Sequence, residues 1–556
     1  MLFSAVWIWA TVAAPILLFF GRIIYNVLFH PLRKFPGPPL AGATGLWKAY
    51  KEVVLQQNLG QELLELHKQY GDIIRISPNE LHFGNPTAFH EIYHHTKRWD
   101  KDDELYNVTG FKSGSFVYRK YAQAKAYASS GTERREVLMP MFSKKAIQNI
   151  EGLVWQNAAK LASAITKLNA SQQSIDLLYA FRSFTLDTIM SFTFGNNIGA
   201  LDAPGFRDPL ILGMDATLPA LPVLKNFSWV RKLTYAFPPT LVMQLLPNAD
   251  AIAPRVYQVR DVIHRQLQAV LNSPEKLEDA QHQTIFHRML DARAWRTKVV
   301  PNMAELHDEG FTLVFAGSNT VADTLVMGHW NLLQKPELLR ALREELRTVW
   351  PSLSAGTRPS LADLEGLPLL TATIKESLRF IPSGVSLTRV VPAQGAVIAG
   401  QHIPAGAAVG MGILHVHQSE SIFENALDFD PARWLPGAHK KENLEHWLVG
   451  LTQDSTHQVS KMDAQAVIHA WLPIQYWLNT IGGNIDYSLN VGLSCVFSNT
   501  YDGLWPIALE QTKGVLNDSD SDPSVGAEQA AFAEVVDEGF IAFDICTFAP
   551  FHEVVT

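Results

Sequence analysis

The feature that most constrains the fold of this chain is a charged pair, Glu376 and Arg379, inside an apolar segment. Residues three apart share one face of a helix, where a guanidinium can meet a carboxylate through two hydrogen bonds. On an exposed helix such a pair is commonplace and contributes about 0.3–0.5 kcal/mol. Residues 367–380 are apolar on several faces, however, and therefore predict a largely buried helix. A buried ion pair needs further partners to offset its desolvation, and Arg433 in Phe429-Asp-Pro-Ala-Arg433-Trp434 is the predicted partner.

Length, charge and cysteine content narrow the class of protein. The chain has 556 residues with no internal repeat, which is enough for a large single-domain enzyme. Its formal net charge of −8 and its lack of a basic stripe argue against nucleic acid as a partner. The two cysteines, Cys495 and Cys546, exclude a disulfide framework, so we expect the catalytic part to lie in a reducing compartment.

The N-terminus predicts a membrane anchor at residues 1–21. From Leu2 to Gly21 no side chain is charged, and the stretch is long enough for one helical span. A cleaved signal peptide is the alternative, but it would normally begin with basic residues, which are absent. Basic residues follow the stretch and place the rest of the chain on the cytosolic side of the membrane. Residues 22–40 are this basic flank and a stiff hinge, Phe35-Pro-Gly-Pro-Pro39.

The segment 41–449 predicts one catalytic domain that is mainly α with small β-sheets, an α+β architecture. Residues 70–83 form two expected strands around a Pro-Asn turn, because β-branched and apolar residues flank turn formers. Helical patterns prevail from about 142 to 350, and residues 390–411 return to strand and turn.

A second segment with functional potential is the apolar helix expected around residues 305–327. Ala316 and Gly317 are small enough to let another body approach the backbone, and Thr320 is placed to hydrogen-bond back to the Ala316 carbonyl and open the helix locally. The alternative is a core helix with a notch of small residues for packing, which is the commoner use of such residues.

Together these segments resemble the cytochrome P450 superfamily of haem-thiolate monooxygenases, in particular membrane-anchored fungal members. The resemblance covers the anchor, the hinge, the strands near residue 75 and the chain onward to about 449. The run Ala316-Gly317-Ser-Asn319-Thr320 is similar to the family's oxygen-binding stretch, and Glu376, Arg379 and Arg433 are similar to its structural triad.

The resemblance implies a haem cofactor, electrons from NADPH through a cytochrome reductase, a lipophilic small-molecule substrate and, together with the predicted anchor, a location at the endoplasmic reticulum. It implies catalytic roles for Thr320 and Asn319. It assigns cofactor contacts to Ala316, Gly317 and two arginines, Arg135 and Arg389, whose charges suit the haem propionates. His417 is expected to be a structural hydrogen-bonding residue rather than a metal ligand.

Two departures from the family concern the distal side and one haem contact. Asn319 stands where the family usually has a carboxylate, and an amide can orient water but cannot ionise. Proton delivery would then depend on Thr320 and water. Gly131 stands four residues before Arg135, where an aromatic residue or histidine is usual, so one haem contact is missing.

The third departure concerns the iron ligand, which stays unknown. The family's Phe-x-x-Gly-x-Arg-x-Cys-x-Gly loop is absent, and the chain continues instead with Gly450-Leu-Thr-Gln-Asp-Ser-Thr-His457. A thiolate is central to the family's chemistry, because its electron donation favours O–O cleavage. Cys495 is the remaining candidate, but Leu493 stands where the arginine belongs; Cys546 matches no better. Both cysteines also suit the role of buried small apolar residues.

The segment 450–556 differs in character from the rest and is treated as an atypical acidic C-terminal region of unknown fold. It contains no arginine and only two lysines, Lys461 and Lys513. Two functions are open. The first is a haem-dependent monooxygenase of fungal secondary metabolism, acting on a terpenoid or polyketide. The second is a catalytically inactive or misspliced protein that at most binds a lipophilic ligand at a membrane.

Overall fold

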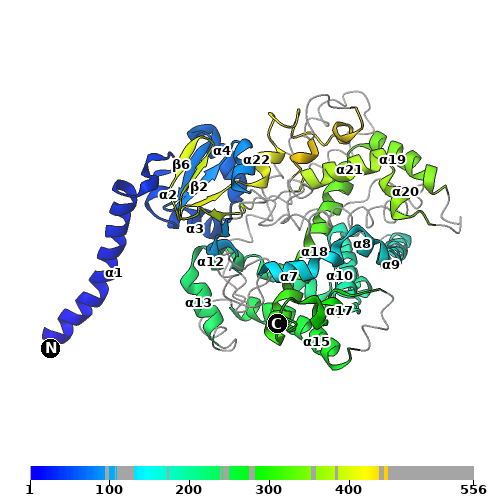
Figure 1. The fold of residues 1–556 in the computed structure, drawn as a ribbon, viewed down its shortest axis with the longest axis horizontal. Helices are drawn as coiled ribbons and strands as arrows, with labels where there is room; N and C mark the ends of the chain where they lie inside the picture. The colour runs from blue at the N-terminus through cyan, green and yellow to red at the C-terminus, as the bar shows by residue number, and fades with distance from the viewer. Residues whose placement is uncertain are drawn as a thin grey trace, which may run out of the picture. The chain divides into compact units, whose positions relative to one another are not determined.

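Helices form most of the structure, and the strands of the described part are short (Figure 1). The computed structural model describes residues 2–93, 99–106, 108, 131–171, 175–237, 241, 249–274, 282–351, 358–381, 386–437 and 444–448. The first helices are α1 (Leu2–Leu28), α2 (Pro39–Ala43), α3 (Leu46–Ala49), α4 (Leu59–Tyr70), α5 (Thr87–Ile92), α6 (Asp103–Tyr106), α7 (Gly131–Leu138), α8 (Lys144–Asn149), α9 (Glu151–Ala170) and α10 (Leu177–Phe194). The later ones are α11 (Pro209–Thr217), α12 (Ala220–Asn226), α13 (Ser228–Ala236), α15 (Ala249–Asn272), α17 (Ile285–Leu290), α18 (Met303–Leu333), α19 (Pro336–Val349), α20 (Leu361–Glu365), α21 (Pro368–Arg379) and α22 (Ile413–His417).

The strands form one five-stranded sheet and one separate pair. They are β1 (Ile73–Ser77), β2 (Glu80–Phe83), β3 (Asp100–Lys101), β4 (Arg389–Val390), β5 (Ala396–Ile398), β6 (Gln401–Ile403) and β7 (Ala408–Gly410). The larger sheet has the order β1-β2-β7-β4-β3, in which only the β2–β7 pair is parallel. β5 and β6 pair antiparallel. Ser77 pairs with Glu80 across the Pro-Asn turn, so the two predicted strands and the strand-and-turn character of 390–411 are confirmed.

The hinge predicted at residues 35–39 lies against β1. The Arg75 amide donates to the Pro36 carbonyl at 2.7 Å, and a Cβ at Gly37 would stand 2.4 Å from the Arg75 carbonyl oxygen. Only glycine allows this close approach of two backbones. The buried Arg75 guanidinium also donates to the carbonyls of Asn26 and Pro78, at 3.1 Å and 2.7 Å. The hinge therefore joins the end of α1 to the first strand.

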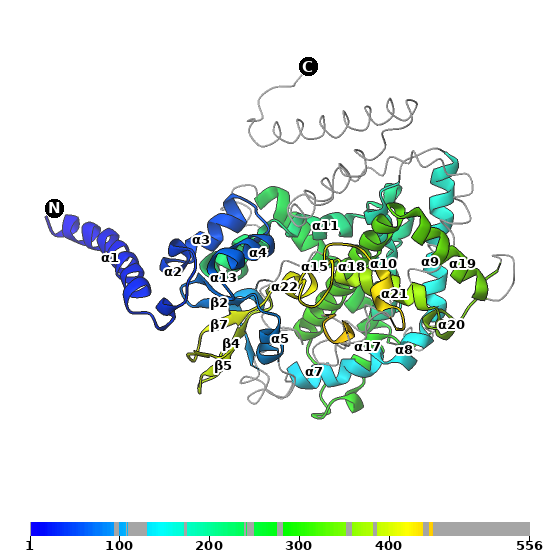
Figure 2. The same ribbon diagram turned by 90° about the horizontal axis from the view of Figure 1, so that it is seen from above.

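Helix α18 is the central helix of the two larger apolar cores. It starts with a capping box, in which Asn302 accepts from the Glu305 amide and Glu305 accepts from the Asn302 amide. Its first half contributes Phe311 to a core shared with α10, α15 and α17, and its second half contributes Leu325 to a core shared with α9, α19 and α21. α10 lies alongside α18 (Figures 1 and 2). α10 and α18 together therefore set the position of residues 316–320.

Helix α21 is the buried helix that the sequence predicts around Glu376. Pro368 stands in its first turn, where a missing N–H costs nothing, and the helix ends at Arg379. Glu376 and Arg379 are 0% and 2% exposed, so their ion pair is removed from water.

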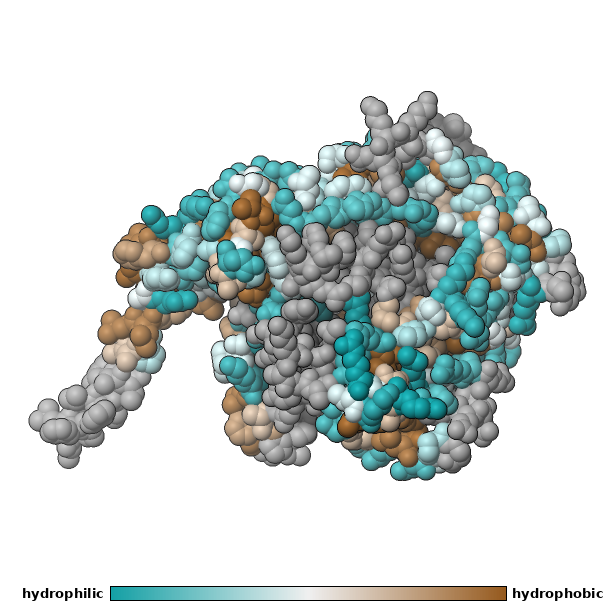
Figure 3. All heavy atoms as spheres, viewed as in Figure 1, coloured by the Kyte–Doolittle hydropathy of each residue, from teal (hydrophilic) through white to brown (hydrophobic). Residues whose placement is uncertain are grey.

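In the face shown in Figure 3, hydrophilic residues cover much of the described surface between smaller apolar patches.

The predicted membrane anchor is not supported by the structure. Residues 2–28 do form one helix, but its described side chains begin only at Ala13 and include Arg22. A span requires about 20 consecutive apolar residues. Within the described residues, no helix has both the length and the apolar character to cross a bilayer. This finding contradicts the predicted transmembrane anchor and the endoplasmic-reticulum location derived from it.

Candidate functional site

The middle of α18 carries the residues predicted to face dioxygen. Thr320 is exposed, although the residues that follow it, Val321 and Ala322, are buried. Ala316 lies one turn earlier on the same face and is half-buried. A long core helix therefore presents an open face at its centre, lined by small side chains. This face is the position that a flat cofactor could cover.

Thr320 makes the hydrogen bond that the sequence predicts. Its Oγ1 donates to the Ala316 carbonyl at 2.8 Å. The helix nevertheless runs without interruption from Met303 to Leu333, so this bond does not open the helical ladder as expected. Because the hydroxyl oxygen retains acceptor capacity, Thr320 can still accept a hydrogen bond from water on the open face.

Gly317 faces α10 rather than the open face. A Cβ at this position would stand 2.7 Å from Cγ1 of Ile189, which lies on α10. On the next residue, the Ser318 carbonyl accepts from Thr185 Oγ1 at 2.7 Å. At Gly317 the structure thus favours the packing notch, which was the alternative to a cofactor contact. The glycine still serves the site, because it sets how closely α18 approaches α10.

Asn319 is held by an arginine that the sequence analysis did not single out. Arg182 on α10 donates from Nη2 to Asn319 Oδ1 at 2.9 Å, and its Nη1 forms an ion pair with Asp215. Tyr179 donates to the same Asp215 carboxylate at 3.2 Å. Burial, with the nearby Asp215 carboxylate, raises the pKa of Tyr179. The amide oxygen of Asn319 is therefore directed into a network between α10, α11 and α18.

The two arginines predicted to meet propionates differ in their surroundings. Arg389, on β4, is 9% exposed and donates to the Tyr106 hydroxyl at 2.6 Å. Its guanidinium also lies 5.2 Å from the ring centroid of Tyr93, a cation–π distance. Arg135, on α7, is half-buried. Its neighbour Arg134 is fully buried and forms ion pairs with Glu305 and Glu309 of α18.

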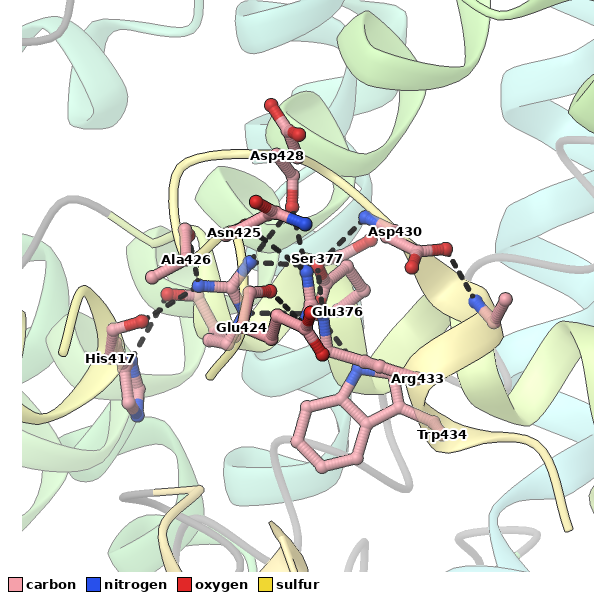
Figure 4. Close-up of polar contacts among 12 residues, drawn as sticks. Glu376, Ser377, His417, Glu424, Asn425, Ala426, Asp428, Asp430, Arg433 and Trp434 are labelled. Atoms are coloured by element: carbon pink, nitrogen blue, oxygen red, sulfur yellow. Dashed lines mark hydrogen bonds and ion pairs between the residues drawn. The ribbon is translucent and has the colours of Figure 1, made fainter. Parts of the chain in front are cut away.

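Glu376 is the acceptor on which the predicted triad converges. Arg379 donates to it through two atoms, Nη2 to Oε1 at 2.7 Å and Nε to Oε2 at 2.9 Å. Arg433 donates from Nε to Oε1 at 3.1 Å. Trp434 Nε1 and the Asp430 amide add bonds of 2.7 Å and 2.9 Å (Figure 4). One buried carboxylate thus accepts five hydrogen bonds, and the contacts predicted for Arg379 and Arg433 are present.

The remaining donors of the two arginines hold the loop between α22 and the 3-10 turn Pro431–Trp434. Arg379 donates to the carbonyls of His417 and Asp428 at 2.7 Å and 3.1 Å. Arg433 donates to the Glu424 carbonyl at 2.8 Å. Because these bonds use the charged side chains of α21 and the turn to fix a loop backbone, the triad shapes residues 417–434 and offers no free group for chemistry.

His417 takes the structural part that the sequence predicts. Its Nδ1 lies 3.0 Å from the Arg379 carbonyl oxygen, so the neutral ring donates there. The side chain is 1% exposed. Burial, and then the Arg379 charge, lowers the pKa of His417 to about 3. The ring is therefore neutral in the folded protein and fixes α22 to the end of α21.

Cys495 and Cys546, the two cysteines considered as iron ligands, lie outside the described residues, as does the whole segment 450–556. The described part contains no cysteine, because both cysteines of the chain are in that segment. The described residues that could contact a haem are Ala316 and Thr320 on the open face of α18 and the buried Arg389 on β4. In their chemistry, small side chains suit contact with a flat ring, and a guanidinium suits a propionate.

Comparison with known proteins gives one family. The family model described as cytochrome P450 matches residues 36–448. The cytochrome P450 monooxygenase aflU of Aspergillus parasiticus is 31% identical over 441 residues, which cover 78% of this chain and 84% of that protein. The cytochrome P450 monooxygenase macH of Penicillium terrestre is 30% identical over 442 residues, with the same coverage. A conidiogenone synthase of Penicillium rubens is 29% identical over 436 residues, also with 78% and 84% coverage.

Proposed function

Because the chain belongs to the cytochrome P450 family, we propose that it is a haem-dependent monooxygenase that inserts one oxygen atom from dioxygen into a lipophilic small molecule. The family uses a haem iron and takes electrons from a redox partner. A mainly helical fold with small sheets agrees with this membership. The observation that carries the proposal is the exposed Thr320 at the centre of a helix whose residues are mostly buried, within the matched part of the chain.

Two residues of the chain, Thr320 and Asn319, have proposed roles in this reaction. Haem, when bound, supplies the iron at which dioxygen is reduced. The Thr320 hydroxyl donates a hydrogen bond to the Ala316 carbonyl, and its oxygen can accept a hydrogen bond from a water on the open face. Asn319 has no ionisable group and its oxygen accepts from Arg182. Thr320 and water are therefore the groups that we expect to deliver protons.

We assign the holding of the cofactor to residues on α18, β4 and α7. Ala316 would contact the ring, because its small side chain and half-buried position leave room. Arg389 would balance a propionate, since its buried guanidinium already has neutral phenol and carbonyl partners rather than a carboxylate among its hydrogen bonds. Arg135 is the second proposed propionate partner. The iron ligand stays unknown, and Cys495, which lies outside the described residues, is the candidate that would supply a thiolate.

The substrate and redox partner are proposed from the relatives. Two are named only as monooxygenases, and one is named for conidiogenone synthesis. We propose a terpenoid or polyketide substrate in fungal secondary metabolism and electrons from NADPH through a cytochrome reductase. The test is incubation of the holoprotein with reductase, NADPH and ¹⁸O₂ over a panel of such compounds. Products that gain one labelled oxygen support the proposal. NADPH consumption without labelled product from any compound opposes it.

A Thr320→Val variant tests the proton-delivery role. Valine keeps the shape but removes the hydroxyl, and we expect NADPH consumption to persist while hydrogen peroxide replaces product. Thr324→Val is the matched control, because Thr324 Oγ1 makes the same bond to the carbonyl four residues earlier, at 2.9 Å, yet the residue is 1% exposed. Equal coupling in both variants would show that the Thr320 hydroxyl has no special part.

The second function is an inactive protein, and the missing Phe-x-x-Gly-x-Arg-x-Cys-x-Gly loop favours it. Such a protein would retain the scaffold and bind a lipophilic ligand without turnover. Translating the genomic DNA after the Val449 codon in all three frames separates the possibilities. A motif found in another frame would mean that the natural enzyme is whole and that this sequence is misspliced. Its absence would favour a diverged protein.

A further inference from the structure

Three histidines from distant parts of the sequence meet beside the five-stranded sheet. His67 comes from α4, His82 from β2 and His415 from α22, and Figure 2 shows these elements grouped around the sheet. The ring centroids of the three pairs are 5.0, 5.0 and 4.7 Å apart. One nitrogen from each ring lies within 4.8 Å of the other two. Three imidazoles are thus directed at one small volume.

Hydrogen bonds fix the proton positions on two of the rings. The Gly412 amide donates to His82 Nε2 at 2.9 Å, so a neutral His82 carries its proton on Nδ1. That Nδ1 lies 2.8 Å from His67 Nε2, which must therefore accept. His67 then carries its own proton on Nδ1 and donates to the Gly71 carbonyl at 2.7 Å. An imidazole that faces a site with Nε2 and donates from Nδ1 to a backbone carbonyl has the usual setting of a metal ligand.

The third ring lacks the partners that the other two have. His415 is 5% exposed, and among the described residues neither of its ring nitrogens has a hydrogen-bond partner of good geometry. A neutral imidazole has one donor and one acceptor, and leaving them unsatisfied in the interior is unfavourable. Because an isolated charge is costly in the interior, a ring as buried as this one is neutral and has one lone pair available for a ligand.

We propose that His67, His82 and His415 form a binding site for a zinc ion, separate from the haem site. Imidazole nitrogens are preferred ligands of zinc, copper and nickel, whereas magnesium and calcium prefer oxygen ligands. Zinc binds histidine nitrogen at about 2.0–2.1 Å, which in a tetrahedron separates two ligands by roughly 3.4 Å. The His67–His82 pair at 2.8 Å needs to open only slightly to accept the ion.

The site has an entry and an open fourth position. His67 is half-buried, whereas His82 is fully buried, so the ion would enter from the side of α4 and a water could complete the coordination. Once bound, the ion would cross-link α4, β2 and α22. Helix α22 also carries His417, which is bonded to Arg379, so the cross-link would connect the sheet to the loop network of the triad.

Zinc binding would break one hydrogen bond at His82. If Nδ1 ligates zinc, the ring proton moves to Nε2, and the Gly412 amide loses its acceptor. We therefore expect zinc to increase hydrogen exchange at the Gly412 amide while exchange elsewhere in the sheet slows. Loss of an outer hydrogen bond typically weakens metal affinity by about 10- to 100-fold. We expect micromolar rather than tighter affinity.

The experiment is a zinc titration of the full chain, free of any histidine tag and pretreated with a chelator. Isothermal titration should give one zinc per chain for the wild type. His67→Gln and His415→Gln should each weaken binding at least tenfold. His402→Gln is the matched control, because His402 is exposed on β6 and lies outside the cluster. Circular dichroism of each zinc-free variant checks that it folds, and His67→Gln is the safer variant because its ring is only half-buried.

The outcomes are decisive for this site and independent of the monooxygenase proposal. One zinc in the wild type that is lost in both cluster variants, and kept in His402→Gln, supports the site. No stoichiometric zinc in the wild type overturns it, and so does undiminished affinity in either cluster variant. Because none of these readouts needs haem or turnover, failure of the zinc site would leave the proposed function untouched.

Discussion

Replacing Glu376 by glutamine tests how much the buried triad of Glu376, Arg379 and Arg433 contributes to the stability of the fold. The carboxylate is 0% exposed and accepts five hydrogen bonds, three of them from two buried arginines. Glutamine keeps the shape, but it removes the charge and replaces one acceptor oxygen with an NH₂ group that faces donors. Removing one partner of a buried ion pair typically costs about 3–5 kcal/mol, because the other charge stays buried without compensation. We expect a loss of that size in the free energy of unfolding.

The chain supplies a closely matched control for this substitution. Glu337 and Arg340 have the same residue types and the same spacing on α19, but they are 82% and 60% exposed. Glu337→Gln should cost no more than about 0.5 kcal/mol, the range for exposed pairs. Urea denaturation followed by tryptophan fluorescence and by circular dichroism measures both losses. Equal losses in the two variants, both below about 1 kcal/mol, would refute the argument that burial and convergence make the triad different.

Three further predictions concern other contacts. Gly317→Ala should destabilise the fold by about 1–3 kcal/mol, because the new Cβ would stand 2.7 Å from Ile189. Adding Ile189→Ala should recover part of this loss. Full stability of Gly317→Ala in thermal unfolding would contradict this packing. Arg134→Met should cost about 3 kcal/mol or more in the same assay, since Glu309 is fully buried beside it, and adding Glu309→Gln should recover part of the loss. The pKa of His417, lowered to about 3, means that the unfolded chain takes up a proton below about pH 6.5 when the folded chain does not. Stability should therefore fall by up to about 1.4 kcal/mol per pH unit between pH 6.5 and pH 3, and an unchanged slope in His417→Gln would oppose this assignment.

Local patterns predicted the parts of the site that depend on one segment. The three-residue spacing of Glu376 and Arg379, in an apolar helix, was enough to predict a buried pair in need of a partner. The hydrogen bond from Thr320 to Ala316 follows from the four-residue period of a helix. The turn at residues 78–79 follows from its Pro-Asn pair, which has β-branched residues before it and apolar residues after it. Each of these features is set within a few residues of chain.

Contacts between distant segments were beyond such patterns. Nothing local says which of the neighbouring arginines Arg134 and Arg135 faces α18, and the structure shows that Arg134 pairs with Glu309 there. Arg182 reaches Asn319 across 137 positions of sequence, so its role depends on how α10 packs on α18. The three histidines of the proposed zinc site have no characteristic spacing. Their convergence requires β2 to pair with β7, which immediately precedes α22.

The N-terminal helix shows a different limit of prediction from sequence. Sequence hydropathy predicted a helix there, and residues 2–28 do form one. Its crossing of a membrane was a further inference from uncharged length, and the described residues do not bear it out. Helix formation depends on local backbone preference, whereas a span also depends on a continuous apolar length of about 20 residues. The two predictions needed separate evidence.

The carbon monoxide difference spectrum of the reduced protein tests the central claim most directly. If the chain is a haem-thiolate monooxygenase, the ferrous carbon monoxide complex should show the strongly red-shifted Soret band of thiolate ligation. Cys495→Ala should abolish that band if Cys495 is the ligand, and a band that survives the substitution would exclude Cys495. Failure to bind haem, or a Soret band of the histidine-ligated type, would contradict the monooxygenase proposal for this chain.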